Sequence, residues 1–259
     1  MASSRSTLGR SRASALTARR TLRVFCLLSL GYTAGFEQAF EPVTFVHIPK
    51  TGGTSIRHAL VEAGCHAMRV PRTAQAHLLT AAAATQNGRR CILVLREPTD
   101  RFVSAYSYFM SFNEAIATRA REGHPTSLRV RHPSFPTVGS LIDATGAHNA
   151  DTRFMDSTIF APQSKWVNVQ DFERTTVVCY DERLSERAAS AISRVTSPPC
   201  NVTIPRINVA ARPDSEALLN ETHRAWLRKR YARDYALWEE HCGPGHDPPQ
   251  TRERRHSAT

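Results

Sequence analysis

Three short apolar runs, separated by segments with helical periodicity, constrain the fold of this 259-residue chain most strongly. The runs are VTFVHI at 43–48, CILVL at 91–95 and TTVVCY at 175–180. Strands that are apolar on both sides, with amphipathic helices between them, are typical of a parallel sheet covered by helices on both faces. The pattern therefore predicts an α/β fold with a central parallel sheet in a single domain.

The segments that follow the runs carry apolar residues at the spacing of one helix face. Helices are predicted from Thr54 onward, around Phe102 and Phe109, and over 182–194. A long C-terminal helix is predicted to bury Leu227, Tyr231, Tyr235 and Trp238. Because ligands of parallel sheets bind at the carboxyl ends of the strands, the residues directly after the runs are the first candidates for a site.

The first run leads into the sequence PKTGGTS at 49–55. Gly52 and Gly53 would allow a tight turn in which successive backbone N–H groups face an anion at the start of the next helix. The candidate phosphate ligands are Lys50, Thr51, Gly52, Gly53, Thr54 and Ser55. In the Walker pattern the lysine follows the glycines, whereas here it precedes them, and the loop does not match GxGxxG. An alternative is that the glycines only tighten the turn and that Lys50 is a solvated charge.

The second run ends at Arg96, and the sequence REPTDRFVSAY continues into a helix. One face of that helix carries Arg101, Ser104 and Tyr108, at i, i+3 and i+7. Arg96 and Ser104 are predicted to converge on a second phosphate beside the first. An alternative is that Arg96 pairs with Glu97 or Asp100.

In this order, HIPKTGGTS and LVLREPTDRFVSAY resemble the two nucleotide-binding motifs of the sulfotransferase family. The variant is most similar to Golgi-type carbohydrate sulfotransferases such as the heparan sulfate 2-O and 6-O enzymes. Three later segments resemble the same group, namely PQSKWV, PRINVAAR and YARDYALWEE, so the resemblance covers roughly residues 43–240.

The resemblance implies a P-loop-like sulfotransferase fold and an O-sulfotransferase that uses 3′-phosphoadenylyl sulfate (PAPS) as co-substrate. It implies that Lys50 neutralises the leaving oxygen, that the loop after it holds the 5′-phosphate, and that Arg96 and Ser104 bind the 3′-phosphate. Sulfuryl transfer poses the same electrostatic problem as phosphoryl transfer. Because the nucleotide leaves readily, we expect no metal.

The acceptor hydroxyl needs a general base. In the heparan sulfate enzymes a histidine between the two motifs has this role, and His77, predicted to start a helix, is the corresponding candidate. His66 and His58 are alternatives, followed by the carboxylate of Glu62. His47 is expected to be a structural residue, or to support the site from behind, because it lies within the first predicted strand.

The chain carries 34 Lys and Arg against 23 Asp and Glu, a formal net charge of +11 that favours a polyanionic partner. Together with the resemblance, this charge leads us to expect an acidic glycan or another hydroxyl acceptor, and no nucleic acid. Candidate basic surfaces are the predicted loop at 118–136 and the helix face at 223–233. A P-loop-type nucleotide kinase and a non-catalytic polyanion-binding protein are the alternative functions. The kinase should show a Walker lysine and a carboxylate for Mg²⁺, and the binding protein would not need paired phosphate motifs.

Residues 1–40 are interpreted as a basic segment followed by a short apolar stretch, Val24 to Phe36, that acts as a signal anchor or signal peptide. The Arg-rich start also fits an organelle transit peptide. The catalytic domain is expected over 41–242, in the Golgi lumen and anchored by a single membrane pass, or alternatively secreted. The tail at 243–259 is expected to be disordered.

The sequons at Asn201 and Asn220 favour the secretory route and predict a glycoprotein. Cys91 and Cys179 lie in apolar runs and are predicted to be small core residues. The three other cysteines of the domain, Cys65, Cys200 and Cys242, would allow at most one disulfide among themselves. The spacing of Cys and His residues does not point to a zinc site.

Overall fold

The structure is a computed structural model that describes residues 42–71, 77–122, 135–146, 155, 159–167, 169–205 and 218–244. These residues all belong to one compact unit, Phe40–Thr259. Within the described ranges, no helix is long and apolar enough to cross a membrane. The predictions for residues 1–40, for the PRINVAAR segment from 206, for the basic loop at 123–134 and for the tail after 244 lie outside the described residues.

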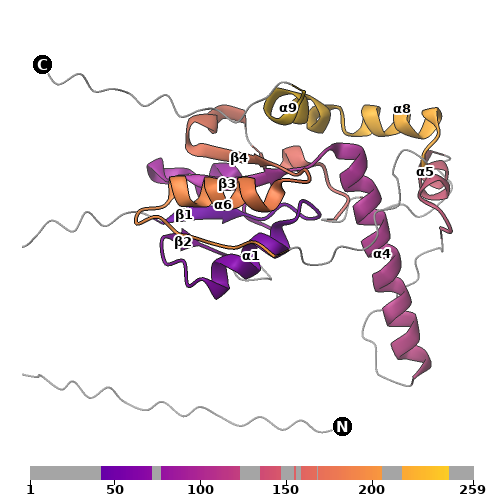
Figure 1. Cartoon of the computed structure of the whole chain (residues 1–259). Helices are drawn as coiled ribbons and strands as arrows, with labels where there is room; N and C mark the ends of the chain where they lie inside the picture. The colour runs from indigo at the N-terminus through magenta and orange to yellow at the C-terminus, as the bar shows by residue number, and fades with distance from the viewer. Residues whose placement is uncertain are drawn as a thin grey trace, which may run out of the picture. The chain divides into compact units, whose positions relative to one another are not determined.

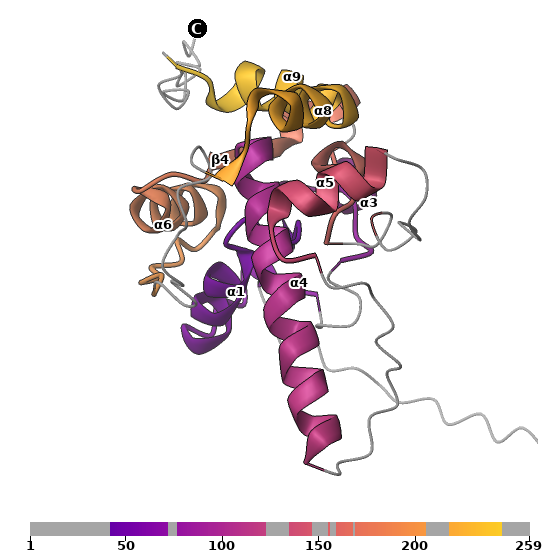
Figure 2. The same cartoon turned by 90° about the vertical axis from the view of Figure 1, so that its right-hand side faces the viewer.

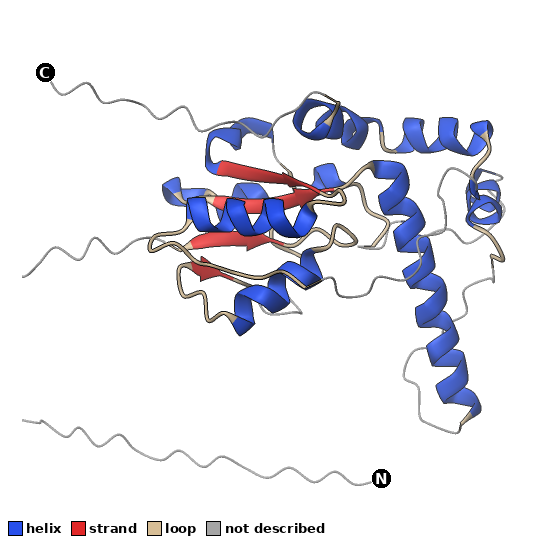
Figure 3. Cartoon of the chain, viewed as in Figure 1, coloured by secondary structure: helices blue, strands red, loops and turns tan. Residues whose placement is uncertain are grey.

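Four parallel strands form the central sheet, in the order β2–β1–β3–β4 (Figures 1 and 3). They are β1 Val43–Val46, β2 Met68–Arg69, β3 Cys91–Leu95 and β4 Thr175–Cys179. Thr44 pairs with Cys91, and Cys91 pairs with Thr175 on its other side. The predicted parallel α/β sheet is confirmed, and three strands coincide with the apolar runs. The fourth, β2, is only two residues long and shows no pattern that would predict it.

Helices follow the strands as the periodicity predicted. The described helices are α1 Gly53–Glu62, α3 Ala81–Ala84, α4 Pro98–Arg121, α5 Val138–Gly146, α6 Leu184–Val195, α8 Glu221–Arg230 and α9 Ala232–Cys242. Short 3-10 turns are η1 Gln86–Gly88, η3 Gln163–Lys165 and η4 Val169–Arg174. Helix α4 leaves the end of the sheet and extends well beyond it, so the segment from 118 to 121 is helical rather than loop (Figure 1).

Side chains that alternate along the strands build a hydrophobic core on each face of the sheet. On one face, Phe45 and Val178 pack with residues of α1 and α6. On the other face, Val46 and Leu93 pack with α3, Trp166 and α9. A further cluster joins α4, α5 and α8 (Figure 2). The sheet is therefore covered on both faces, and the carboxyl ends of its strands point toward the start of α4 (Figure 3).

The predicted long C-terminal helix is wrong: it is interrupted at Tyr231, which separates α8 from α9. The Tyr231 ring is buried, and its hydroxyl donates a 2.8 Å hydrogen bond to the carbonyl of Phe160. In the first turn of α9, the buried Asp234 carboxylate accepts hydrogen bonds from the backbone N–H groups of Gln163 and Ser164. These two contacts fix a change of direction that helical periodicity cannot show.

Two disulfides cross-link the domain, where at most one was predicted. Cys65 is bonded to Cys200, and Cys179 is bonded to Cys242. The prediction for Cys179 was wrong because the end of β4 meets the end of α9, a contact that the apolar run does not reveal. Cys91 is fully buried in the core, as predicted. Disulfides are typical of domains that fold in the secretory pathway, and the two disulfides of this domain indicate that route.

Candidate active site

The loop after β1 turns sharply before α1 begins. Lys50 and Gly52 both have left-handed backbone conformations, with φ of 68° and 80°. Glycine adopts this conformation at little cost, whereas a lysine does so only where its surroundings hold it. The buried Thr51 hydroxyl donates a 2.9 Å hydrogen bond to the carbonyl of Ile48 and so helps to hold the turn. The sequence thus places a strained lysine at the carboxyl end of the first strand.

Both glycines of this loop are also required by packing. A Cβ on Gly52 would lie 2.7 Å from Cδ2 of Leu184 and 2.8 Å from the ring of Tyr180, and a Cβ on Gly53 would overlap the ring of His47. A close approach of this kind tolerates no side chain. The turn and the packing around it therefore explain the two glycines without a ligand, and the case for a phosphate site depends on the charges around the loop.

Three basic side chains meet at this loop. Nη1 of Arg96, at the end of β3, donates to the carbonyl of Lys50 at 3.2 Å. Arg101, in the first turn of α4, donates from Nε to the carbonyl of Pro49 at 3.0 Å and from Nη2 to that of Ile159 at 3.2 Å. Arg101 was predicted to lie on a helix face away from the apolar stripe, but it is only 2% exposed. It is buried because loop carbonyls satisfy its N–H groups, so its role in the structure is to hold the loop.

The environment of the loop is strongly positive. The pKa of Lys50 is lowered to about 8, first by burial and then by the charges of Arg96 and Arg101. Nζ of Lys50 lies 4.4 Å from the ring centroid of Tyr108, and the guanidinium of Arg96 lies 4.4 Å from that of Tyr180. Aromatic faces stabilise cations, but they do not neutralise them. An anionic group bound at Lys50 would relieve the repulsion that lowers its pKa, so these residues fit a phosphate.

The other candidate phosphate ligands lie around the start of α1 and in α4. Thr54 is exposed, while Ser55 is buried and its backbone N–H donates to the carbonyl of Gly52 at 3.1 Å. The amide of Ser55 therefore belongs to the turn. Ser104 is partly exposed in the second turn of α4. These positions leave Thr54 and Ser104 with side chains that solvent or a ligand can reach.

Gln163 fixes the end of β3; it lies in the PQSKWV segment, but no role was predicted for it from the sequence. Its side chain accepts a hydrogen bond from the backbone N–H of Arg96 at 3.0 Å and donates one to the carbonyl of Arg96 at 2.8 Å. The carboxylate of Asp234 in turn holds Gln163 by accepting a hydrogen bond from the backbone N–H of Gln163. Glu97, proposed as an alternative partner of Arg96, accepts a hydrogen bond from the backbone of Asp100 at 2.6 Å. Segments that are far apart in the chain thus position Arg96.

His47 and His77 lie next to each other, with ring centroids 4.7 Å apart. His47 follows the last residue of β1 and is buried, and its pKa is lowered to about 4 by burial, by His77 and by Arg57. His77 was predicted to start a helix, but it lies in a turn, where its carbonyl accepts a 2.9 Å hydrogen bond from the indole of Trp166. Its Nδ1 atom is buried and has no hydrogen-bond partner among the described residues.

The other candidate bases lie elsewhere on the domain. His58 is exposed on α1 and pairs with Glu62 at 3.0 Å. His66 is exposed and lies two residues before β2, which pairs in parallel with β1, so it lies at the amino ends of the strands, whereas Lys50 follows their carboxyl ends. Of the candidate bases, His77 is the one that packs against a residue at the carboxyl end of β1.

Comparison with known proteins adds one finding. A model of the sulfotransferase family matches residues 39–239, which include all four strands and both motif segments. No curated protein and no solved structure matches the chain.

Proposed function

Because the chain belongs to the sulfotransferase family, we propose that it moves a sulfuryl group from PAPS to a hydroxyl of a carbohydrate acceptor. Membership of the family implies a PAPS-dependent transferase. The observation that carries the proposal is the cluster of Lys50, Arg96 and the start of α1 at the carboxyl ends of β1 and β3. The similarity of its motifs to the heparan sulfate 2-O and 6-O enzymes supports a sugar acceptor.

PAPS, when bound, supplies a sulfuryl group on an anhydride with its 5′-phosphate. Lys50 would neutralise the negative charge that grows on the 5′-phosphate oxygen as the sulfur–oxygen bond breaks. The N–H groups at the start of α1 and the hydroxyl of Thr54 would hold the same phosphate. The acceptor oxygen would attack the sulfur in line with the leaving oxygen and lose its proton to His77.

Arg96 and Ser104 are proposed to bind the 3′-phosphate. Arg96 is 6% exposed and anchored to the backbone of Lys50, so a phosphate bound to it would lie deep against the end of the sheet. Ser104 is more accessible and would add a hydroxyl donor from α4. Arg96 would thus link the two phosphate sites through its contact with Lys50.

His77 is proposed as the general base. Replacement of His77 by alanine should lower turnover by about two to four orders of magnitude, the usual share of general acid–base catalysis, with PAP affinity nearly unchanged. Full activity of His77→Ala together with loss of activity in His66→Ala or His58→Ala would reassign the base.

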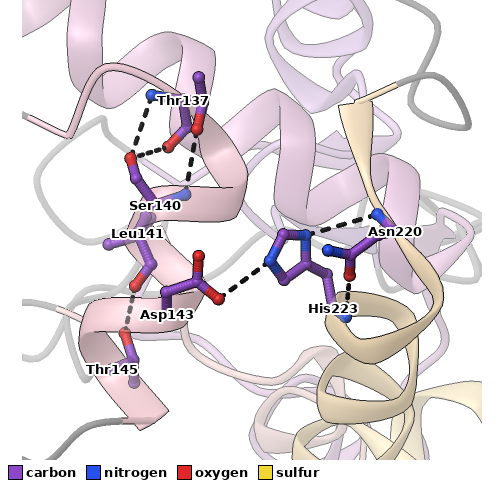
Figure 4. Close-up of polar contacts among 7 residues, drawn as sticks. All are labelled: Thr137, Ser140, Leu141, Asp143, Thr145, Asn220 and His223. Atoms are coloured by element: carbon purple, nitrogen blue, oxygen red, sulfur yellow. Dashed lines mark hydrogen bonds and ion pairs between the residues drawn. The ribbon is translucent and has the colours of Figure 1, made fainter.

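A Golgi-lumenal location, with the membrane reached through residues 1–40, is part of the proposal. Both sequon asparagines are exposed. Asn220 caps α8: its side-chain oxygen accepts the backbone N–H of His223 at 2.9 Å, and Nε2 of His223 lies 3.0 Å from Asp143 on α5 (Figure 4). The cap uses the oxygen of the Asn220 amide, whereas a glycan is attached to its nitrogen, so capping and glycosylation are compatible.

Calorimetric titration of the full chain with PAP and ATP tests the function against its alternatives. We expect PAP to bind in magnesium-free buffer and ATP to bind at least about tenfold more weakly, because a 3′-phosphate adds charge-assisted hydrogen bonds. Tighter, Mg²⁺-dependent binding of ATP would favour a nucleotide kinase. Binding of neither nucleotide would favour a non-catalytic polyanion-binding protein.

A further inference from the structure

Two aromatic rings form an exposed surface on α4. The side chains of Tyr108 and Phe112 are 48% and 43% exposed, although most large apolar side chains of the described residues are buried. They are one helical turn apart, with ring centroids separated by 6.2 Å and ring planes inclined by 14°. Nearly parallel exposed rings of this kind are costly to leave in water, and they mark a candidate binding surface.

This aromatic surface adjoins the residue that is proposed to bear the transfer chemistry. Nζ of Lys50 lies 4.4 Å from the ring centroid of Tyr108. Phe112 is the next residue outward on the same face of α4, which projects from the sheet (Figure 2). A molecule that presents a hydroxyl near Lys50 would therefore have its neighbouring part beside these two rings.

Further along, the same helix face carries one positive charge. Arg119 lies seven residues beyond Phe112, two turns along the same side of α4, and is exposed. An occupant of the whole face should accordingly combine a flat apolar surface with negative charge. Sugar rings of acidic glycans have both, because one side of the ring presents polarised C–H groups and uronic acids or sulfates supply the charge. The electron-rich face of an aromatic ring attracts such C–H groups.

Resting on the proposed function, we propose that Tyr108 and Phe112 form an acceptor subsite, on which a sugar next to the sulfated residue of an acidic glycan stacks. The subsite would align the acceptor chain with α4, with its acidic groups toward Arg119. It would contribute to the affinity for the acceptor and leave the binding of the nucleotide to the loop after β1.

Binding of oligosaccharides to the full chain saturated with PAP tests this subsite without any need for turnover. The probes are hexasaccharides of alternating glucuronate and N-acetylglucosamine or N-acetylgalactosamine, and a tyrosine-containing acidic peptide serves for comparison. We expect Phe112→Ala to weaken binding of the preferred hexasaccharide about five- to tenfold, the loss expected for one stacking contact, and Phe112→Trp to retain it. The matched control is Val61→Ala, which removes an apolar side chain that is 62% exposed on α1 and should have no effect.

Unchanged hexasaccharide affinity in Phe112→Ala would overturn the subsite, and so would failure of the wild type to bind either hexasaccharide. Tighter binding of the peptide, lost in Phe112→Ala, would assign the surface to a protein acceptor and also overturn the proposal. PAP affinity separates these results from failure of the proposed function. It should stay within about twofold of wild type in Phe112→Ala, because Phe112 is proposed to contact the glycan and not the nucleotide. If the wild type binds no PAP at all, the proposed function itself is wrong.

Discussion

The imidazole rings of His47 and His77 lie with their centroids 4.7 Å apart, beside the loop that carries Lys50. The absence of a side chain at Gly53 leaves room for the His47 ring at the start of α1. Burial and the neighbouring His77 keep His47 neutral, with a pKa of about 4. His47 was predicted to support the structure or the site from behind. It follows the last residue of β1, and its ring packs against that of His77, the proposed base.

The buried His47 should make stability depend on pH. In the unfolded chain its pKa returns to the ordinary value of 6.5, so between pH 6.5 and 4 the unfolded state binds more protons than the folded state. Stability should therefore fall as the pH falls through this range, by up to about 3 kcal/mol from this group. Denaturant unfolding at a series of pH values checks this, and His47→Gln should flatten the slope. Parallel curves for wild type and His47→Gln would exclude the effect.

Lys50 should take up a proton when the nucleotide binds. Its pKa of about 8 in the free protein means that it loses charge as the pH rises through 8, and a bound phosphate should raise that pKa again. Calorimetry at about pH 8.5 in buffers of different ionisation enthalpy should show proton uptake with PAP, and uptake should vanish near pH 6.5. Lys50→Met provides the control, because it cannot titrate. Equal proton uptake in Lys50→Met would show that another group is responsible.

Substitutions of Ser104 and of Arg96 should differ in their effects on the affinity for two nucleotides, one with a 3′-phosphate and one without it. Ser104→Ala removes an accessible hydroxyl and should weaken PAP by about 1.5 to 3 kcal/mol, while adenosine 5′-phosphosulfate, which lacks the 3′-phosphate, should bind as before. Arg96→Ala also removes the hydrogen bond to the carbonyl of Lys50, so it should weaken both nucleotides. Comparative titrations with both ligands check this. Equal losses for both ligands in Ser104→Ala would remove Ser104 from the 3′-phosphate site.

The sequon at Asn220 gives a test of the compartment. Thr222→Ala destroys the sequon but keeps the Asn220 cap, so protein secreted from animal cells should lose one glycan in a mobility assay with its stability unchanged. Asn220→Ala removes both the sequon and the cap, so it should lose the same glycan and also lower the stability by about 1 kcal/mol. If wild type and Thr222→Ala migrate identically before and after glycosidase treatment, Asn220 is not glycosylated.

The sequence predicted the centre of the sheet well because β1 and β3 are buried throughout and appear as continuous apolar runs. It also placed Lys50 and Arg96 at adjacent strand ends, since parallel strands bring their carboxyl ends together. It did not predict the burial of Arg101, the contact of Gln163 with Arg96, or the second disulfide. Each of these depends on a contact between distant segments, for which local periodicity carries no signal.

Tyr108 shows the same limit within the site. Its spacing placed it on one helix face with Arg101 and Ser104. The ammonium group of Lys50 lies over the Tyr108 ring. This contact depends on the left-handed conformation of Lys50, which a spacing pattern cannot show. The pattern identified the elements of the site, and the turn decided which side chains meet there.

Transfer of labelled sulfate from PAPS to an oligosaccharide, measured for the full chain and for Lys50→Ala, tests whether the protein is a sulfotransferase that depends on Lys50. Wild type should label at least one acidic hexasaccharide. Lys50→Ala should keep the unfolding midpoint of wild type and lose at least about two orders of magnitude in turnover, the effect of removing a group that stabilises developing charge. Folded Lys50→Ala protein that transfers sulfate at nearly the wild-type rate would show that Lys50 does not stabilise the leaving group.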